Sequence, residues 1–354
     1  MVAVKGGALT GTLDGMRLDY PWSEPPAPGT TIEVAPGVQW LRMPLPFQLN
    51  HINLWLVEDG AGWAVVDTGV GLPDVRALWD RIFAGHLGGR PITRVIVTHF
   101  HPDHMGNAGW LTDRWNTALW CAQAEFLVGQ VAWRTGDARD NGPRLRHYRL
   151  NGCSEAQLAA LAERGNHYPQ LVPTIPTEFR AVRDGEGLTL GGRRFTMIVG
   201  HGHSPEHAAF WCEEAGVLIS GDQVLPRITT NVSVWPDQPW GNPLRGYLDS
   251  LERYRGIGPE ALVLPAHGLP FRGLPERLAE LRTHHDTRLA QALDAIIEPR
   301  SAAEVVPALF RRALDSHQLG FALGEALSHL HYLEADGRAV RITGDDGVHR
   351  FRKA

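Results

Sequence analysis

The amino-acid sequence predicts an α/β fold in which two halves, each with its own sheet and helices, stack sheet to sheet. Short β-branched runs alternate with stretches of helical spacing, and the order of strands, helix and strands repeats about the middle of the chain. Several strand-like runs are followed directly by a histidine or aspartate in a loop marked by glycine or proline. The length of 354 residues allows one large domain of this kind and a smaller one beside it.

The first half follows an arm, residues 1–30, whose glycine and proline content predicts an extended segment on the surface. A hairpin is marked by Asp59-Gly60. A helix is predicted over residues 73–83 from the helical spacing of its apolar side chains, and another begins at Asn107. The expected strands lie at residues 38–43, 53–58, 63–67, 94–98 and 118–121.

Residues 123–178 interrupt this alternation and are interpreted as a helical insert. Its helices are expected near residues 124–133 and 154–164, the second with Ser154 and Gln157 in a capping box. The second half resumes after the insert, with a helix expected near residues 244–254 and strands at 195–199, 208–212, 217–220 and 261–264.

The two-sheet domain is predicted to cover residues 31–275, and residues 276–354 to form a linking helix and a small separate domain. The linking helix runs to about residue 297, and Ser301 with Glu304 begins a second helix. The elements expected after it are a helix at residues 321–333 and strands at 339–342 and 348–351. Helices followed by a β-hairpin resemble a winged helix.

The loop after the strand at residues 94–98 carries three histidines and one aspartate within six positions: His99, His101, Asp103 and His104. Neutral imidazole and ionised carboxylate are ligands for zinc, iron and manganese. Many α/β proteins place their sites on loops that leave the carboxyl ends of strands. A lone histidine would be interpreted as a core residue, whereas this cluster predicts a metal site.

Four other strands also end at a candidate ligand: Asp67, His203, Asp222 and His267. Each motif is weak alone, because dipeptides such as Gly-Asp and Ala-His are common. Together, each after a strand, they predict one composite site. The stretch from residue 200 to 207 contains two further histidines, His201 and His207, and each has either a supporting role behind the ligands or a structural or solvent-exposed position.

In these motifs the chain resembles the metallo-β-lactamase superfamily, whose signature is HxHxDH followed by His, Asp and His. The resemblance covers roughly residues 30–275 and implies an αββα sandwich with the metals at one edge of the two sheets. The ligands that it implies for one metal are His99, His101 and His203. Those for the second metal are Asp103, His104 and His267. It also implies that Asp222 bridges both metals and that Asp67 orients a loop or a ligand imidazole.

The activity implied by the resemblance is hydrolysis by a hydroxide that bridges two metal ions and attacks a carbonyl or phosphorus atom. Two such ions lower the pKa of the shared water towards neutrality, to about 7 for catalytic zinc. Asp103, besides binding metal, would hydrogen-bond the nucleophile and pass on its proton. Two Zn²⁺ ions per chain are expected, although iron and manganese fit the same ligands.

Departures from subfamily patterns narrow the activity and leave alternatives open. Asp222 stands where the commonest true β-lactamases have cysteine, and His267 follows too closely for the inserted domain of the β-CASP nucleases. Persulfide dioxygenases share HxHxDH but bind one iron, so a mononuclear iron enzyme stays open, as does a non-catalytic metal-binding sensor. The C-terminal unit also resembles the β-lactamase-like protein 2 and hydroxyacylglutathione hydrolase-like group, which includes single-strand endoribonucleases.

Charge and composition argue against nucleic acid and membrane as partners. The formal net charge is −5, and the helix at residues 321–333 carries no lysine or arginine to bind phosphates. The C-terminal unit is therefore expected to pack beside the active site or to form a homodimer contact. No apolar run is long enough to cross a bilayer, and three cysteines without a CxxC motif favour the cytoplasm.

The insert is the expected specificity element. The side chains expected to contact substrate, one of them outside the insert, are Arg134, Arg144, Arg146, Tyr148 and Trp235. Guanidinium groups suit carboxylate or phosphate, so the expected substrate is a small anionic thioester, ester or lactone. A solvated, partly paired surface is the equal alternative for the arginines, and core packing for the tryptophan.

Overall fold

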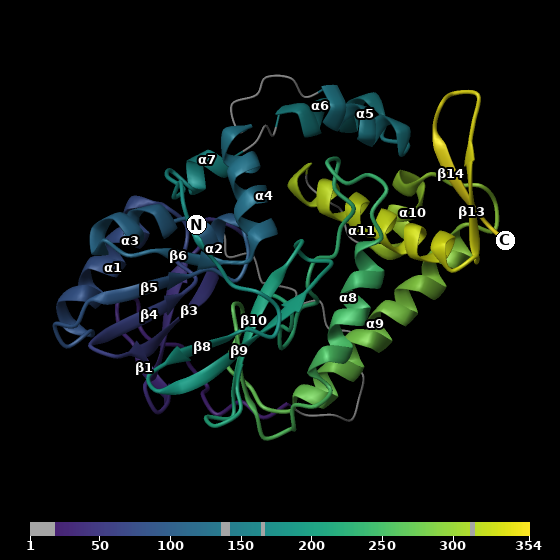
Figure 1. The fold of residues 1–354 in the computed structure, drawn as a ribbon. Helices are drawn as coiled ribbons and strands as arrows, with labels where there is room; N and C mark the ends of the chain where they lie inside the picture. Colours follow the sequence, from purple (N-terminus) through teal and green to yellow (C-terminus); the bar gives the residue numbers. More distant parts are fainter. Residues whose placement is uncertain (1–17, 136–141, 164–166, 312–315) are drawn as a thin grey trace, which may run out of the picture.

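The computed structural model describes residues 18–135, 142–163, 167–311 and 316–354. Two β-sheets face each other, and helices cover their outer sides (Figure 1). Within the described residues the first sheet has seven strands in sequence order: β1 (Ile32–Ala35), β2 (Val38–Pro44), β3 (His51–Asp59), β4 (Gly62–Val66), β5 (Ile92–Ile96), β6 (Leu119–Cys121) and β7 (Arg180–Ala181). The second sheet has the order β12 (Leu262–Pro265), β11 (Val217–Gly221), β10 (His207–Cys212), β9 (Arg193–Gly200) and β8 (Gly187–Leu190).

A hydrophobic core fills the space between the sheets because side chains alternate in direction along each strand. On β3, Trp55 lies in this inter-sheet core, whereas its neighbours Leu54 and Leu56 pack under the outer helices. On β9, Phe195 and Met197 complete the same inter-sheet core. Strands buried on both faces explain the nearly continuous apolar runs that predicted them.

Helices cover the outer face of each sheet. The first sheet packs against α1 (Pro73–Gly85) and α3 (Ala108–Trp115), and the second against α8 (Pro243–Leu251) and α9 (Leu274–Ala295). These layers are the αββα sandwich that the sequence predicts, and the 3₁₀ turn Glu252–Tyr254 extends α8.

Strand direction brings the candidate ligands to one edge of the sandwich. β4 and β5 are parallel neighbours, and so are β11 and β12. β9 runs in the same direction as β11 because both are antiparallel to β10. The carboxyl ends of neighbouring strands that point the same way meet at one edge, where loops build sites.

The insert contains more helix than the sequence predicts. The predicted helices are α4 (Gln123–Arg134) and α6 (Glu155–Glu163), and Ser154 and Gln157 make both hydrogen bonds of the predicted capping box. Two helices were not predicted, α5 (Gly142–Leu150) and α7 (Tyr168–Leu171). Helix α5 has few apolar residues and no apolar stripe, so its spacing gives no helical signal.

The C-terminal domain contains α10 (Ala302–Leu309), α11 (Ser316–Ala335) and the hairpin β13 (Ala339–Thr343) with β14 (His349–Lys353). Ser301 and Glu304 form the predicted capping box at the start of α10. Helix α11 packs against α8, α9 and α6, so this domain lies beside the second sheet and the insert (Figure 1). Among the described residues, none of the helices combines the length and apolar character needed to span a membrane.

The predicted N-terminal arm is described only from residue 18, because residues 1–17 lie outside the described part of the chain. Asp19 pairs with Arg272 in an isolated β-bridge, and Leu18 and Tyr20 pack against the core around α8 and α9. This part of the arm therefore packs against the second half of the sandwich, near α8 and α9.

Two histidines meet in the core between α9 and α11. His285 and His329 are both completely buried, with 3.3 Å between Nδ1 of the first and Nε2 of the second. Burial, and then the neighbouring histidine, lower the pKa of His285 to about 2, and burial lowers the pKa of His329 to about 4. The folded state therefore holds both rings neutral.

We predict that this pair makes the protein acid-sensitive. Because the folded pKa values lie below the unfolded value of about 6.5, the stability from neutral burial is present above pH 6.5 and is lost as the pH falls towards 4. His285→Gln should reduce the pH slope of the unfolding free energy by up to ~1.4 kcal/mol per pH unit. Urea denaturation of metal-free protein at pH 7, 6 and 5 measures this slope. Exchange of the exposed His86 for Gln is the control, and equal slopes for wild type and His285→Gln would contradict the prediction.

Candidate metal centre

The HxHxDH loop leaves β5 and leads into the short helix α2 (Pro102–Met105). Nε2 of His99 lies 2.8 Å from Nδ1 of His101. From the other sheet, Nε2 of His203 lies 3.1 Å from Nε2 of His99. These nitrogens all lie within 4.8 Å of one another and form what we call the first ligand group.

A second ligand group consists of Asp103, His104 and His267, whose ligand atoms also lie within 4.8 Å of one another. Asp222 stands between the two groups. Its Oδ2 lies 3.3 Å from Nε2 of His203, and its Oδ1 lies 3.4 Å from Nε2 of His267. One carboxylate therefore turns one oxygen to each group.

The donor set fits divalent metal ions. Nε2 of His104 and Oδ1 of Asp222 are buried without a hydrogen-bond partner in the part of the chain that the structure describes. Such atoms are destabilising unless a ligand satisfies them. Nδ1 of His203 donates to the carbonyl of Asn231 at 2.8 Å, and Nδ1 of His267 donates to that of His51 at 2.8 Å. Both rings thus turn Nε2 towards the ligand groups, an arrangement typical of metal-binding histidines.

The electrostatics favour the ligand forms of His99, His101 and Asp103, whereas the neighbouring carboxylates raise the pKa of His104 and of His267. Burial, and then nearby histidines, lower the pKa of His99 well below its usual value and that of His101 to about 3. Burial alone would raise the pKa of Asp103, but the adjacent His104 contributes to lowering it to about 2. Uncharged imidazole and ionised carboxylate are the states that bind metal.

Asp67 follows β4 and supports the second ligand group from behind. Its Oδ2 lies 2.8 Å from Nδ1 of His104, and its Oδ1 accepts a hydrogen bond from the backbone N–H of Thr98 at 2.8 Å. Its φ is +63°, a left-handed conformation that aspartate adopts more readily than most residues. One buried carboxylate therefore fixes both the start of the HxHxDH loop and the ring of His104.

The residues that hold His267 were not predicted from the sequence. Nδ2 of the fully buried Asn53 donates to the carbonyls of Pro265 and Gly268 on either side of the His267 loop. His51 accepts from Nδ1 of His267 with its carbonyl and from the N–H of Gly268 with Nε2. Both residues lie on β3, which carries no ligand, so only their polarity inside an apolar run could have marked them.

His207 lies directly behind Asp222. Its Nε2 accepts a hydrogen bond from the backbone N–H of Asp222 at 3.0 Å. Gly221 makes this approach possible, because a Cβ there would lie 2.6 Å from the His207 ring and its φ is +51°. His207 therefore supports the backbone of Asp222 and does not belong to either ligand group.

Two family models match this chain. The model described as "Metallo-beta-lactamase superfamily" matches residues 48–267, which is more than half of the chain, and the model described as "Metallo-beta-lactamase-like, C-terminal domain" matches residues 289–354. The chain belongs to the metallo-β-lactamase superfamily. This membership confirms the predicted resemblance and identifies the chain as a superfamily hydrolase.

Solved structures of the superfamily extend the likeness over nearly the whole chain. A beta-lactamase domain protein from Burkholderia ambifaria is 48% identical with a TM-score of 0.90, covering 95% of this chain and 98% of that one. A metallo-beta-lactamase family protein from Thermus thermophilus is 30% identical with a TM-score of 0.75, covering 91% of this chain and 100% of that one. The C-terminal domain is therefore shared with both.

Curated superfamily relatives are more distant. A "Probable metallo-hydrolase YqjP" from Bacillus subtilis is 23% identical over 84% of this chain and 92% of its own length. A "Lactamase-like protein nscB" from Neosartorya fischeri is 26% identical over 74% of this chain. The matched segment spans only 61% of the length of that fungal relative.

The structure spreads the expected substrate residues over several environments, and their role stays a prediction. Arg134 at the end of α4 and Arg146 on α5 are exposed. Arg144 donates to the carbonyl of Leu161 on α6. Tyr148 is only 6% exposed and belongs to the core around α8 and α11, and the Trp235 ring packs edge-to-face against Phe321. The sequence left core packing as the alternative role for Trp235, and Tyr148 is also packed in the core.

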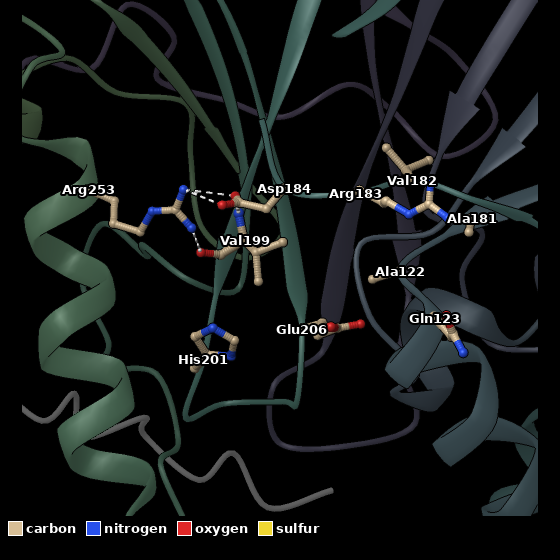
Figure 2. Close-up of a pocket in the computed structure, with 10 residues that line it drawn as sticks. All are labelled: Ala122, Gln123, Ala181, Val182, Arg183, Asp184, Val199, His201, Glu206 and Arg253. Atoms are coloured by element: carbon tan, nitrogen blue, oxygen red, sulfur yellow. Dashed lines mark hydrogen bonds and ion pairs between the residues drawn. The ribbon is translucent and has the colours of Figure 1, made fainter. Parts of the chain in front are cut away.

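A cavity of about 310 Å³ lies beside the loop that follows β9 (Figure 2). His201 and Glu206 line it together with Arg253, which donates to both carboxylate oxygens of Asp184 at 2.8 Å. The exposed ring of His201 bonds back to the carbonyl of Pro205. His201 therefore borders this cavity and is not part of either ligand group.

We predict that Gly221→Ala disrupts the centre far more than an equivalent change elsewhere. Gly216 is the matched control, since its φ of +60° is also left-handed but a Cβ there would meet nothing within 4 Å. Gly216→Ala should cost only the conformational strain of about 1–2 kcal/mol. Gly221→Ala should cost more and displace Asp222, which lowers the metal content. Urea denaturation and elemental analysis measure both effects, and equal behaviour of the two variants would exclude this role for Gly221.

Proposed function

We propose that the protein is a dinuclear metal-dependent hydrolase that cleaves a small, anionic thioester, ester or lactone. The observation that carries this proposal is Asp222, whose two oxygens face two adjoining ligand groups. A pair of divalent ions, with zinc as the expected metal, would supply Lewis acidity and a hydroxide nucleophile near neutral pH. The description of the Bacillus subtilis relative as a probable metallo-hydrolase agrees with this class.

Within the proposed site, Asp103 is the group placed to move a proton. Its side chain is 17% exposed, which makes it the more accessible of the two carboxylates, since Asp222 is 10% exposed. Its low pKa keeps it ionised, and Oδ2 lies 3.5 Å from Nε2 of His267. We propose that it binds metal and also accepts the proton of the attacking water at a carboxylate oxygen.

Several features favour a small substrate over nucleic acid. Helix α11 turns His329 and His331 into the protein, where they are 0% and 5% exposed. A helix that buries both histidines and carries no lysine or arginine offers little to a phosphate backbone. The exposed Arg134 and Arg146 are available to an anionic group of a small substrate.

The proposal is tested by metal analysis followed by a substrate panel. Purified protein should contain two metal ions per chain and hydrolyse at least one thioester, ester or lactone, while single-stranded RNA stays intact. Cleavage of RNA alone would replace the proposal with an endoribonuclease. One iron per chain with consumption of oxygen would indicate a dioxygenase, and bound metal without turnover of any class would indicate a sensor.

His104→Ala should remove the second metal and most of the activity. His104 offers one ligand atom, Nε2, to the second ligand group. Among the described residues, the other members of that group are Asp103 and His267, and neither can take its place. Metal content should fall from two ions to one, with kcat falling at least as strongly. His201→Ala is the control, because that exposed histidine lies on the same loop as His203 but borders the cavity in Figure 2. Unchanged turnover of His104→Ala would exclude a dinuclear mechanism.

A further inference from the structure

Glu125 is a completely buried carboxylate that the proposed chemistry does not use. It lies in the first turn of α4, at the start of the insert, and its side chain is 0% exposed. A buried acid is expected to be paired or fully hydrogen-bonded, because an isolated carboxylate is strongly destabilising away from water. Glu125 reaches this state through three hydrogen bonds to two different loops.

The three donors come from both halves of the sandwich. Oε2 of Glu125 accepts from the backbone N–H of Phe100 at 2.9 Å. Oε1 accepts from Oγ of Ser204 at 2.8 Å and from the backbone N–H of Glu206 at 2.6 Å. One side chain thus connects the loop after β5 in the first sheet with the loop after β9 in the second.

Each of these contacts is close to a side chain of the first ligand group. Phe100 stands between His99 and His101 in the chain, and Ser204 directly follows His203. The second ligand group is held differently, since His104 is supported by Asp67 and His267 by the carbonyl of His51. The hydrogen bonds of Glu125 therefore support the first group selectively.

We propose that Glu125 is a positioning residue that holds the two loops of the first ligand group in register and so sets the affinity of that metal position. The inference rests on the proposed metal site. Charge-assisted hydrogen bonds to a carboxylate are stronger than neutral ones, and the groups that orient metal ligands tune metal affinity. Glu125 acts on the ligands through the backbone of Phe100 and through Ser204, without touching the metal.

Substitution has a clear physical consequence. Glutamine has nearly the same shape as glutamate, but its amide group places an N–H donor against a donor of one of the two loops. One loop then loses its buried acceptor, and His203 is free to move relative to His99. Typical losses for such outer groups are about 10- to 100-fold in metal affinity.

The test titrates metal-free protein with Zn²⁺ alone in competition with a chromophoric chelator. Glu125→Gln should weaken one of two zinc-binding steps about 10- to 100-fold and leave the other unchanged. Ser204→Ala, which removes one of the three hydrogen bonds, should show a smaller loss. Glu206→Gln is the matched control, because its side chain accepts from the N–H of Ala124 and can still do so as an amide.

A double-mutant cycle assigns the affected position. In a His104→Ala background, which leaves the first ligand group intact, Glu125→Gln should show the full loss of zinc affinity. In a His101→Ala background it should add no further loss. Excess Zn²⁺ should restore kcat of Glu125→Gln if any substrate of the panel is turned over, whereas general damage to the fold would not be rescued.

The outcomes separate this inference from the proposed function. Wild-type zinc affinity in Glu125→Gln, or equal loss in both backgrounds, overturns the role of Glu125 while leaving the hydrolase intact. Two bound zinc ions without hydrolysis of any substrate overturns the function while leaving the positioning role intact. If Glu125→Gln does not fold, as circular dichroism would reveal, Ser204→Ala decides the question, and wild-type affinity there overturns the proposal.

Discussion

The arrangement of the two ligand groups depends on one constraint: the two sheets must stay in register at the edge where their strand ends meet. Two backbone hydrogen bonds cross between the sheets there, from the N–H of Ala208 to the carbonyl of Thr98 at 2.8 Å and from the N–H of Asn53 to the carbonyl of Ala266 at 2.7 Å. The first lies beside His99 and the second beside His267. Each ligand group takes ligands from both sheets. A slip of one sheet against the other would therefore pull the ligands of each group apart.

The metal-ligating side chains at this edge are buried. Their burial is energetically unfavourable without a cation and is also what favours metal binding. Asp67, Asp103 and Asp222 are three carboxylates gathered around imidazoles whose Nε2 atoms converge. Without a cation, this concentration of buried acceptors and ring nitrogens is destabilising, as the unpartnered atoms of His104 and Asp222 illustrate. The same concentration of negative charge and lone pairs favours binding of divalent cations. The energetic weakness of the edge and its predicted affinity for metal therefore have one cause.

The sequence predicted the sandwich because its strands are apolar on both faces and end at His or Asp, a combination that needs no tertiary information. It also placed Asp67 and Asp222 at strand ends that the fold brings together. It could not predict elements whose signal arises only after folding. The strand β7 has two residues, and α5 lacks an apolar stripe, so neither shows a usable periodicity. Tyr148 stands among arginines in the sequence, which favours a surface position, yet it is buried in the hydrophobic core that also contains side chains of α11.

Glu125 and Asn53 show the same limit at the level of single side chains. An acidic residue in the first turn of a helix is expected from the helix dipole alone, so Glu125 carries no sequence signal for a buried role. Asn53 is a polar residue in a strand that supplies no ligand. Their importance follows from contacts with loops distant in sequence, which local spacing cannot encode.

The C-terminal domain contacts a loop at the same edge of the sandwich. The loop that carries Asn231, whose carbonyl orients His203, continues to Ser233 and Val234. The N–H of Val234 donates to the carbonyl of Gly324 on α11 at 3.0 Å. A Cβ at Gly324 would lie 2.7 Å from that of Ser233, so glycine permits this close approach of helix and loop. The domain thus packs against the loop whose Asn231 carbonyl is hydrogen-bonded to the His203 ring.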